Sequence, residues 1–210
     1  MNENVTITGG HIKDDMFCHY SYSKEVAKGI TDKATIKSQR PIHDDMKAAF
    51  RKLNPHLAVI CEEVHNLEIG DIDKMPVRPE NMPLDEWEKS LEGIDKKLYA
   101  FVVSGIQYDG SGENEGVILI GKKTLSTGDS VQLTTPKIVW EASSYFFINE
   151  LRVAARDLAD EIMLYMDGKQ APRAIQTEME FPVEEGEEDE DIKPKKRGRR
   201  GSKENPVNID

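Results

Sequence analysis

The sequence has little of what marks secreted or membrane proteins. It contains two cysteines, Cys18 and Cys61, which is too few for a disulfide framework and indicates a reducing compartment. Its apolar runs, such as 57–61 and 117–120, are far too short to cross a bilayer. Residues 1–10 do not show the basic segment followed by an apolar segment that begins a secretion signal. We therefore expect an intracellular, cytoplasmic protein that makes no membrane contact.

Catalytic motifs are also missing. No Gly-x-Ser-x-Gly nucleophile motif occurs, and the glycines around Gly121-Lys122 do not have the spacing of a phosphate-binding loop. The sequence predicts no enzyme, no catalytic residue and no cofactor.

Two groups of metal-ligand residue types occur, but neither has the paired spacing of a structural zinc site. One group is His56, Cys61 and His65, and the other is His11, Cys18 and His19. We interpret Cys61 as a buried thiol beside a surface imidazole. We expect no metal.

His43-Asp44-Asp45 has the residue types of a metal-dependent hydrolase, which would also need further His and Asp ligands nearby. A simpler interpretation makes Asp44 or Asp45 the N-terminal cap of a helix. The hydrolase remains the third functional alternative.

The charge is distributed unevenly. The chain has 28 Lys and Arg against 39 Asp and Glu, a formal net charge of −11. Residues 178–191 hold nine acids and no base, and 193–203 hold seven bases and no acid. The first 177 residues are acidic too, with a net charge of −7. Because 178–210 contain few large apolar side chains, we expect a disordered tail, acidic over 178–191 and then basic over 193–203.

The pattern of apolar residues before the tail predicts six short strands and several helices. The expected strands are 5–8, 16–22, 34–38, 98–108, 117–120 and 131–135. Helices are expected from Asp44 or Asp45, from an Asn54 cap, over a short segment around Trp87, and over a long segment capped by Ser143 or Ser144. Gly9-Gly10 should end the first strand, and Gly29 should form a turn.

This order of elements predicts an α+β domain over 1–177, with a Pro-rich surface loop at 69–83. Its mostly antiparallel sheet of about five to six strands should pack against two main helical segments. The disordered C-terminal tail should follow at 178–210.

The basic segment 193–203 is the feature most suggestive of function. Arg197-Gly198-Arg199 resembles the central Arg-Gly-Arg of AT-hook peptides, which implies contact with the minor groove of DNA. This chain has Arg200 where AT-hooks usually have proline. The charge run predicts non-specific phosphate contact, and it also fits a localisation signal or a solubilising tail. The expected nucleic-acid-binding residues are Lys193, Lys195, Lys196, Arg197, Arg199, Arg200 and Lys203.

Aromatic residues supply a second set of candidates. Exposed rings on strands can stack on unpaired bases, although such rings more often belong to the core. The candidates for base stacking are Tyr20, Tyr22, Tyr99, Phe101 and Tyr108. Trp87, beside the Pro-rich loop, is a candidate for docking a protein partner.

These features predict a non-enzymatic accessory protein of nucleic-acid transactions that binds single-stranded or non-specific DNA, helped by the basic tail. Its partners would be nucleic acid or a replication or repair protein, and a homo-oligomer stays open. The alternative is a phage- or virus-type structural or host-interaction protein that does not contact nucleic acid.

Overall fold

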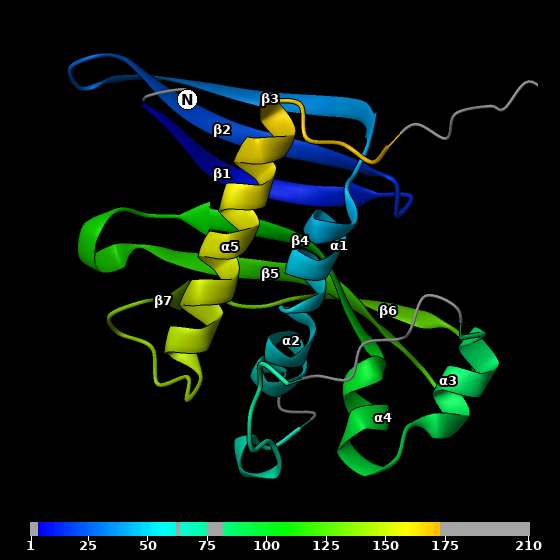
Figure 1. Ribbon diagram of the computed structural model, residues 1–210. Coiled ribbons are helices and arrows are strands. Elements are labelled where there is room, and N and C mark those ends of the chain that lie inside the picture. The colour runs from blue at the N-terminus through cyan, green and yellow to red at the C-terminus, as the bar shows by residue number, and fades with distance from the viewer. Residues whose placement is uncertain (1–3, 62–63, 75–81, 173–210) are drawn as a thin grey trace, which may run out of the picture. The chain divides into compact units, whose positions relative to one another are not determined.

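Two antiparallel meanders lie side by side in one sheet (Figure 1). The computed structural model describes residues 4–61, 64–74 and 82–172. The first meander consists of β1 (Val5–Lys13), β2 (Phe17–Ala27) and β3 (Ile30–Pro41). The second consists of β4 (Phe101–Asp109), β5 (Gly116–Thr124) and β6 (Ser130–Thr134). The strand order is β3-β2-β1-β4-β5-β6, and the short β7 (Ile138–Val139) also pairs with β5. The predicted α+β class is confirmed.

Burial alternates along the start of β2 in the first meander. Cys18 and Tyr20 are buried, while Phe17 and His19 are half-buried. Gly29 turns the chain into β3 with a positive φ of 75°, a conformation that glycine adopts without strain. β3 lies at the edge of the sheet.

The sequence suggested that the first strand ends at Gly9-Gly10, but the strand continues past these glycines. β1 runs on to Lys13 and pairs with β2 on one side and β4 on the other. A Cβ on Gly10 would lie 2.5 Å from Cδ1 of Ile162, a residue of the C-terminal helix. Gly10 therefore permits a close approach of helix and sheet within a continuous strand, rather than forming a turn.

Three helices pack on one face of the sheet (Figure 1): α1 (Asp44–Arg51), α2 (Asn54–Ile60) and α5 (Ile148–Met166). The long helix expected near the end of the domain is present as α5, and its buried stripe repeats at intervals of three and four residues. This stripe consists of Leu151, Ala154, Leu158, Ile162 and Tyr165, each at most 3% exposed. The stripe packs into a single core with the inward residues of the sheet.

The helices begin differently from the predictions. His43, rather than Asp44 or Asp45, caps α1, since its Nδ1 accepts a hydrogen bond from the Asp45 N–H. The Asn54 side chain does not cap α2, because its Oδ1 accepts from the Val103 N–H at 2.8 Å and so joins helix to sheet. α5 begins at Ile148, and the hydroxyl of Ser143 instead accepts from the Tyr145 N–H in the preceding loop.

Two short helices precede the second meander: α3 (Leu84–Ser90) and α4 (Gly93–Tyr99). The expected strand 98–108 therefore starts later, at Phe101, because the preceding residues complete α4. The loop expected at 69–83 lies on the surface only in part, since Ile72 is 3% exposed. Its residues 75–81 lie outside the described residues, as does the whole of the predicted tail 178–210. None of the described helices is long and apolar enough to span a membrane.

Candidate functional site

The face of the sheet opposite α1, α2 and α5 is the candidate site, and we call it the open face. His11 of β1 pairs with His19 of β2, which in turn pairs with Lys37 of β3. On the other side, His11 pairs with Gly105 of β4, which pairs with Ile120 of β5. One row of residues therefore crosses five adjacent strands.

Two glycines show on which side of the sheet this row lies, because each is close to a known neighbour. A Cβ on Gly105 would lie 3.0 Å from Nδ1 of His11 and 3.5 Å from Cβ of Ile120, so these three residues share a face. A Cβ on the adjacent Gly10 would instead meet Ile162 of α5. Since neighbouring residues of a strand point to opposite faces, the histidine row lies on the side away from α5.

Positive charge collects on the open face although the body of the protein is acidic. The same alternation places eight ionisable residues there: His11, Lys13, His19, Glu25, Lys33, Lys37, Asp109 and Lys122. The four lysines are exposed. Asp109 pairs with Lys137 at 2.9 Å, and Lys13 pairs with Asp14 at 3.3 Å. Bases thus outnumber acids on this face, whereas acids outnumber bases in the protein as a whole.

The positive surroundings act on His11. Its pKa is lowered from the ordinary histidine value, first by partial burial and then by the charges of His19 and Lys13. A hydrogen bond to the backbone of Ser104 opposes this shift. The imidazole therefore needs a lower pH, or a bound anion, to become charged.

The predicted stacking residues do not lie on the open face. Tyr20 is 7% exposed and Phe101 is 1% exposed, and both belong to the core beneath the helices. Tyr22, paired with Ile7, lies against Tyr20 on the same side. Tyr20 contacts the ring of Tyr165 of α5 edge-on at a centroid distance of 6.0 Å, and β4, which carries Phe101, packs against α1 and α2.

The remaining stacking candidates are also engaged within the fold. The hydroxyl of Tyr108 donates to the backbone carbonyl of Ala155 in α5, and burial raises the pKa of Tyr108. Tyr99 ends α4, rather than lying on a strand, and contacts the Trp87 ring edge-on at a centroid distance of 6.4 Å. The fold thus gives no support to the base-stacking prediction for any of the five rings.

Trp87 does not form an exposed docking anchor. Its side chain is 8% exposed, and its Nε1 is buried without a hydrogen-bond partner among the described residues. It packs inward because α3 is amphipathic, with its charged residues turned to solvent. The most exposed large aromatic side chain in the described part of the chain is instead Phe146, at 67%.

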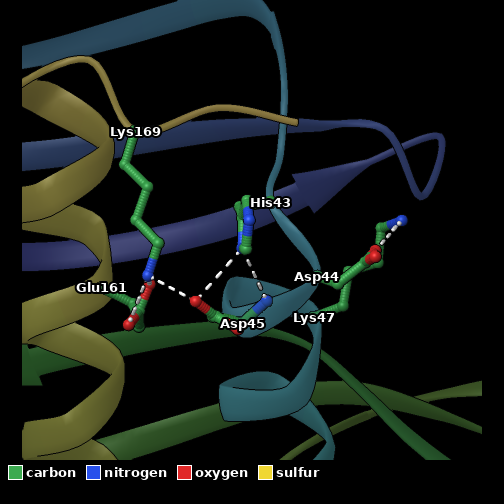
Figure 2. Close-up of polar contacts among 6 residues, drawn as sticks. All are labelled: His43, Asp44, Asp45, Lys47, Glu161 and Lys169. Atoms are coloured by element: carbon green, nitrogen blue, oxygen red, sulfur yellow. Dashed lines mark hydrogen bonds and ion pairs between the residues drawn. The ribbon is translucent and has the colours of Figure 1, made fainter. Parts of the chain in front are cut away.

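The His43-Asp44-Asp45 segment is a structural junction (Figure 2). Nζ of Lys169, which follows α5, lies 2.7 Å from Oδ2 of Asp45 and 2.8 Å from Oε2 of Glu161. Lys47 pairs with Asp44 at 2.9 Å. Lys169 therefore supplies the cation between the carboxylates of α1 and α5. Its ammonium group also lowers the pKa of Asp45 through a hydrogen bond.

The fold divides each of the two histidine–cysteine groups: His11 and His19 remain neighbours on the open face, but Cys18 lies on the opposite side of the sheet. His56 is fully buried, with Nδ1 2.7 Å from the Tyr145 hydroxyl, while His65 is exposed and Cys61 is half-buried. The interpretation of Cys61 as a buried thiol beside a surface imidazole is thus only partly right, since this thiol is half-buried. Cys18 faces the core, and burial raises the pKa of its thiol to about 12. No group of three or more metal-ligating side chains occurs within residues 4–61, 64–74 and 82–172.

Sequence reasoning missed the lysines of the open face. Lys33, Thr35 and Lys37 alternate on one side of β3, and His19 and Ser21 alternate on the matching side of β2. This period of two was visible in the sequence. The register between β2 and β3, which brings these charged residues together, could not be read from the sequence.

The predicted nucleic-acid-binding residues Lys193, Lys195, Lys196, Arg197, Arg199, Arg200 and Lys203 lie outside the described residues. Comparison with known proteins adds nothing to these features, since no family model, curated protein or solved structure matches the chain.

Proposed function

We propose that this chain is a non-enzymatic accessory protein of nucleic-acid transactions that binds single-stranded or non-specific DNA. The observation that supports the proposal is the collection of Lys13, Lys33, Lys37 and Lys122 on one open sheet face of an acidic protein. A polyanion is repelled by most of this surface and attracted to the open face, which gives it a preferred place to bind.

Phosphate contacts would supply the affinity. The open face bears four lysines, two histidines, the apolar Ile120 and one half-buried aromatic ring, Phe17, which pairs with Lys13. Because charged groups predominate, most contacts would be with phosphate and binding would be largely independent of sequence. The seven bases of 193–203 would add further phosphate contacts from the same chain. The two cysteines, which form no disulfide, support a reducing, cytoplasmic location.

Anisotropy of a labelled oligothymidylate, titrated with the full chain over a salt series, tests the proposal. We expect the triple variant K33Q/K37Q/K122Q to bind more weakly, with a log–log salt slope smaller in magnitude by about 2, since each phosphate contact on single strands contributes about 0.7. The control K28Q/K89Q/K96Q makes the same change in net charge at exposed lysines elsewhere. Equal slopes for the two variants, or no binding by the unmodified chain, would contradict the proposal.

The basic tail is tested separately. Replacing its seven bases with glutamine should reduce the magnitude of the slope by up to about 5 if all seven engage phosphate. If only the tail variant loses affinity, the binding belongs to 193–203 and the open face does not take part.

A protein-binding role without nucleic-acid contact is the second candidate. Phe146 favours it, because this ring is 67% exposed and contacts Phe147 edge-on at 4.9 Å, which holds it on the surface. Light scattering distinguishes the two: a defined oligomer that F146S converts to monomer, with no oligonucleotide binding, would favour the second candidate.

A further inference from the structure

The pairing of His11 with His19 is the most specific feature of the open face. Residues directly opposite each other in an antiparallel pair have Cβ atoms about 5 Å apart, so both imidazoles can contact one small group. Lys37 extends the row by one more strand. Gly105, on the far side of His11, has no side chain to cover the ring: a Cβ there would lie 3.0 Å from Nδ1.

The charged groups around the histidine pair are mostly positive. Lys13 is on the same strand as His11, and Lys37 is across from His19. The two acids of the open face are engaged elsewhere: Asp109 pairs with Lys137, and Glu25 accepts a hydrogen bond from the Gly29 N–H. At the end of β1, Asp14 pairs with Lys13. On β5, across the gap left by Gly105, Ile120 is apolar and Lys122 is the next residue on the same side.

We propose that His11, His19 and Lys37 form a phosphate-binding row on which a nucleic-acid strand is held, and that this row binds the strand more tightly as the pH falls below neutral. The proposal rests on the proposed function, because it names where on the open face the phosphates bind.

The direction of the pH effect follows from the surroundings. An imidazole is mostly neutral at about pH 8 and gains charge as the pH falls through about 6.5. Partial burial, His19 and Lys13 all lower the pKa of His11, so without an anion this ring becomes charged only at lower pH. A phosphate bound between the two imidazole rings offsets the repulsion that His11 experiences from His19 and Lys13. It therefore favours the charged form of His11. By linkage, the strand and the protons then bind cooperatively.

The first test compares binding of oligothymidylate at about pH 8 and about pH 5.5, a range in which thymine does not titrate. The full chain should bind more tightly at the lower pH, with a salt slope larger in magnitude by about 1.4, or about 0.7 for each histidine that contacts phosphate. The variant H11Q/H19Q should lose this difference and keep its binding at about pH 8.

The control H65Q removes an exposed histidine outside the open face and should behave as the unmodified chain does. If H11Q/H19Q keeps the full pH difference, the phosphate row is wrong while the proposed function stands. If the unmodified chain binds at neither pH, both are wrong.

NMR titration of the histidine ring protons provides a second test that does not depend on the variants folding. Saturating oligothymidylate should raise the pKa of His11 and shift the ring-proton resonances of His19, and it should leave the ring-proton resonances of His65 in place. Ring resonances of both open-face histidines that do not respond to the oligonucleotide would overturn the proposal.

Discussion

Tyr165, near the end of α5, and Ser38 of β3 are joined by a hydrogen bond of 2.8 Å between their hydroxyl groups, both of which are buried. The Tyr165 hydroxyl also bonds to the backbone carbonyl of Arg40, whose guanidinium lies 4.7 Å from the centre of the tyrosine ring. This contact ties the C-terminal helix to the edge strand of the first meander, 127 residues away in sequence.

The variant Y165F should therefore be less stable by about 1–3 kcal/mol, since it leaves the buried Ser38 hydroxyl without one of its partners. Urea denaturation followed by circular dichroism measures the change. Y22F is the matched control, because Tyr22 lies on the same side of the sheet but is only half-buried. Equal unfolding midpoints for Y165F and Y22F would show that the hydroxyl contact contributes little.

The buried His56 should make the fold sensitive to acid. Burial lowers its pKa from 6.5 to about 3, so below about pH 6.5 the unfolded chain takes up a proton that the folded chain does not. The neutral, buried His56 adds no destabilisation above about pH 6.5. As the pH falls from there toward 3, the free energy of unfolding decreases by roughly 5 kcal/mol in total.

The double variant H56F/Y145F tests this, because it removes the titrating group together with the hydroxyl that it contacts. Chemical denaturation at a series of pH values should show a flatter stability profile than that of the unmodified chain. H65Q, at an exposed histidine, should leave the profile unchanged. A profile for H56F/Y145F as steep as that of the unmodified chain would assign the acid sensitivity to other groups.

The close approach of β1 and α5 at Gly10 should make this position intolerant of a side chain. In G10A the new Cβ would lie 2.5 Å from Cδ1 of Ile162, so one of the two must move, at a cost of about 1–3 kcal/mol. I162V removes that methyl group, and G10A/I162V should therefore be more stable than the sum of the single changes predicts. Thermal unfolding measures this coupling. G70A, with no atom within 4 Å of the new Cβ, is the control for the loss of a glycine.

Trp87 should matter to the fold rather than to binding. W87F removes an indole N–H that has no hydrogen-bond partner among the described residues, so it should cost much less than W87A, for which about 3–5 kcal/mol is expected. Denaturant unfolding checks the difference. Neither oligonucleotide nor protein binding should change in W87F. A selective loss of partner binding with the fold intact would restore Trp87 as a docking residue.

Much of the fold could be predicted from local patterns. The alternation on β2, the edge position of β3 and the buried stripe of α5 each follow from a period of two or of 3.6 residues. The errors concern residues whose partners are distant in sequence. In the sequence, Gly10 looks like the end of a strand, but its lack of a side chain makes room for Ile162 of α5. Asn54 looks like a helix cap, but its side chain bonds to the backbone of Val103 instead.

The candidate site was less predictable for the same reason. The exposed lysines and histidines occur in separate strands, and only the register brings Lys37, His19 and His11 into one row. Tyr20 and Phe101 were correctly predicted to lie on strands. The sequence did not reveal which face of the sheet their rings occupy, because this depends on where the helices pack. Total charge and composition do not contain this information.

The central position of the first strand also constrains how the chain is made. β1 pairs with β4, so Gly9 and Gln107 become neighbours only when the ribosome has synthesised nearly a hundred further residues. Until then, one side of β1 exposes unsatisfied backbone groups that could pair with another chain. Folding during translation is therefore completed late, and a nascent chain that stalls before residue 101 should be the species most prone to aggregate.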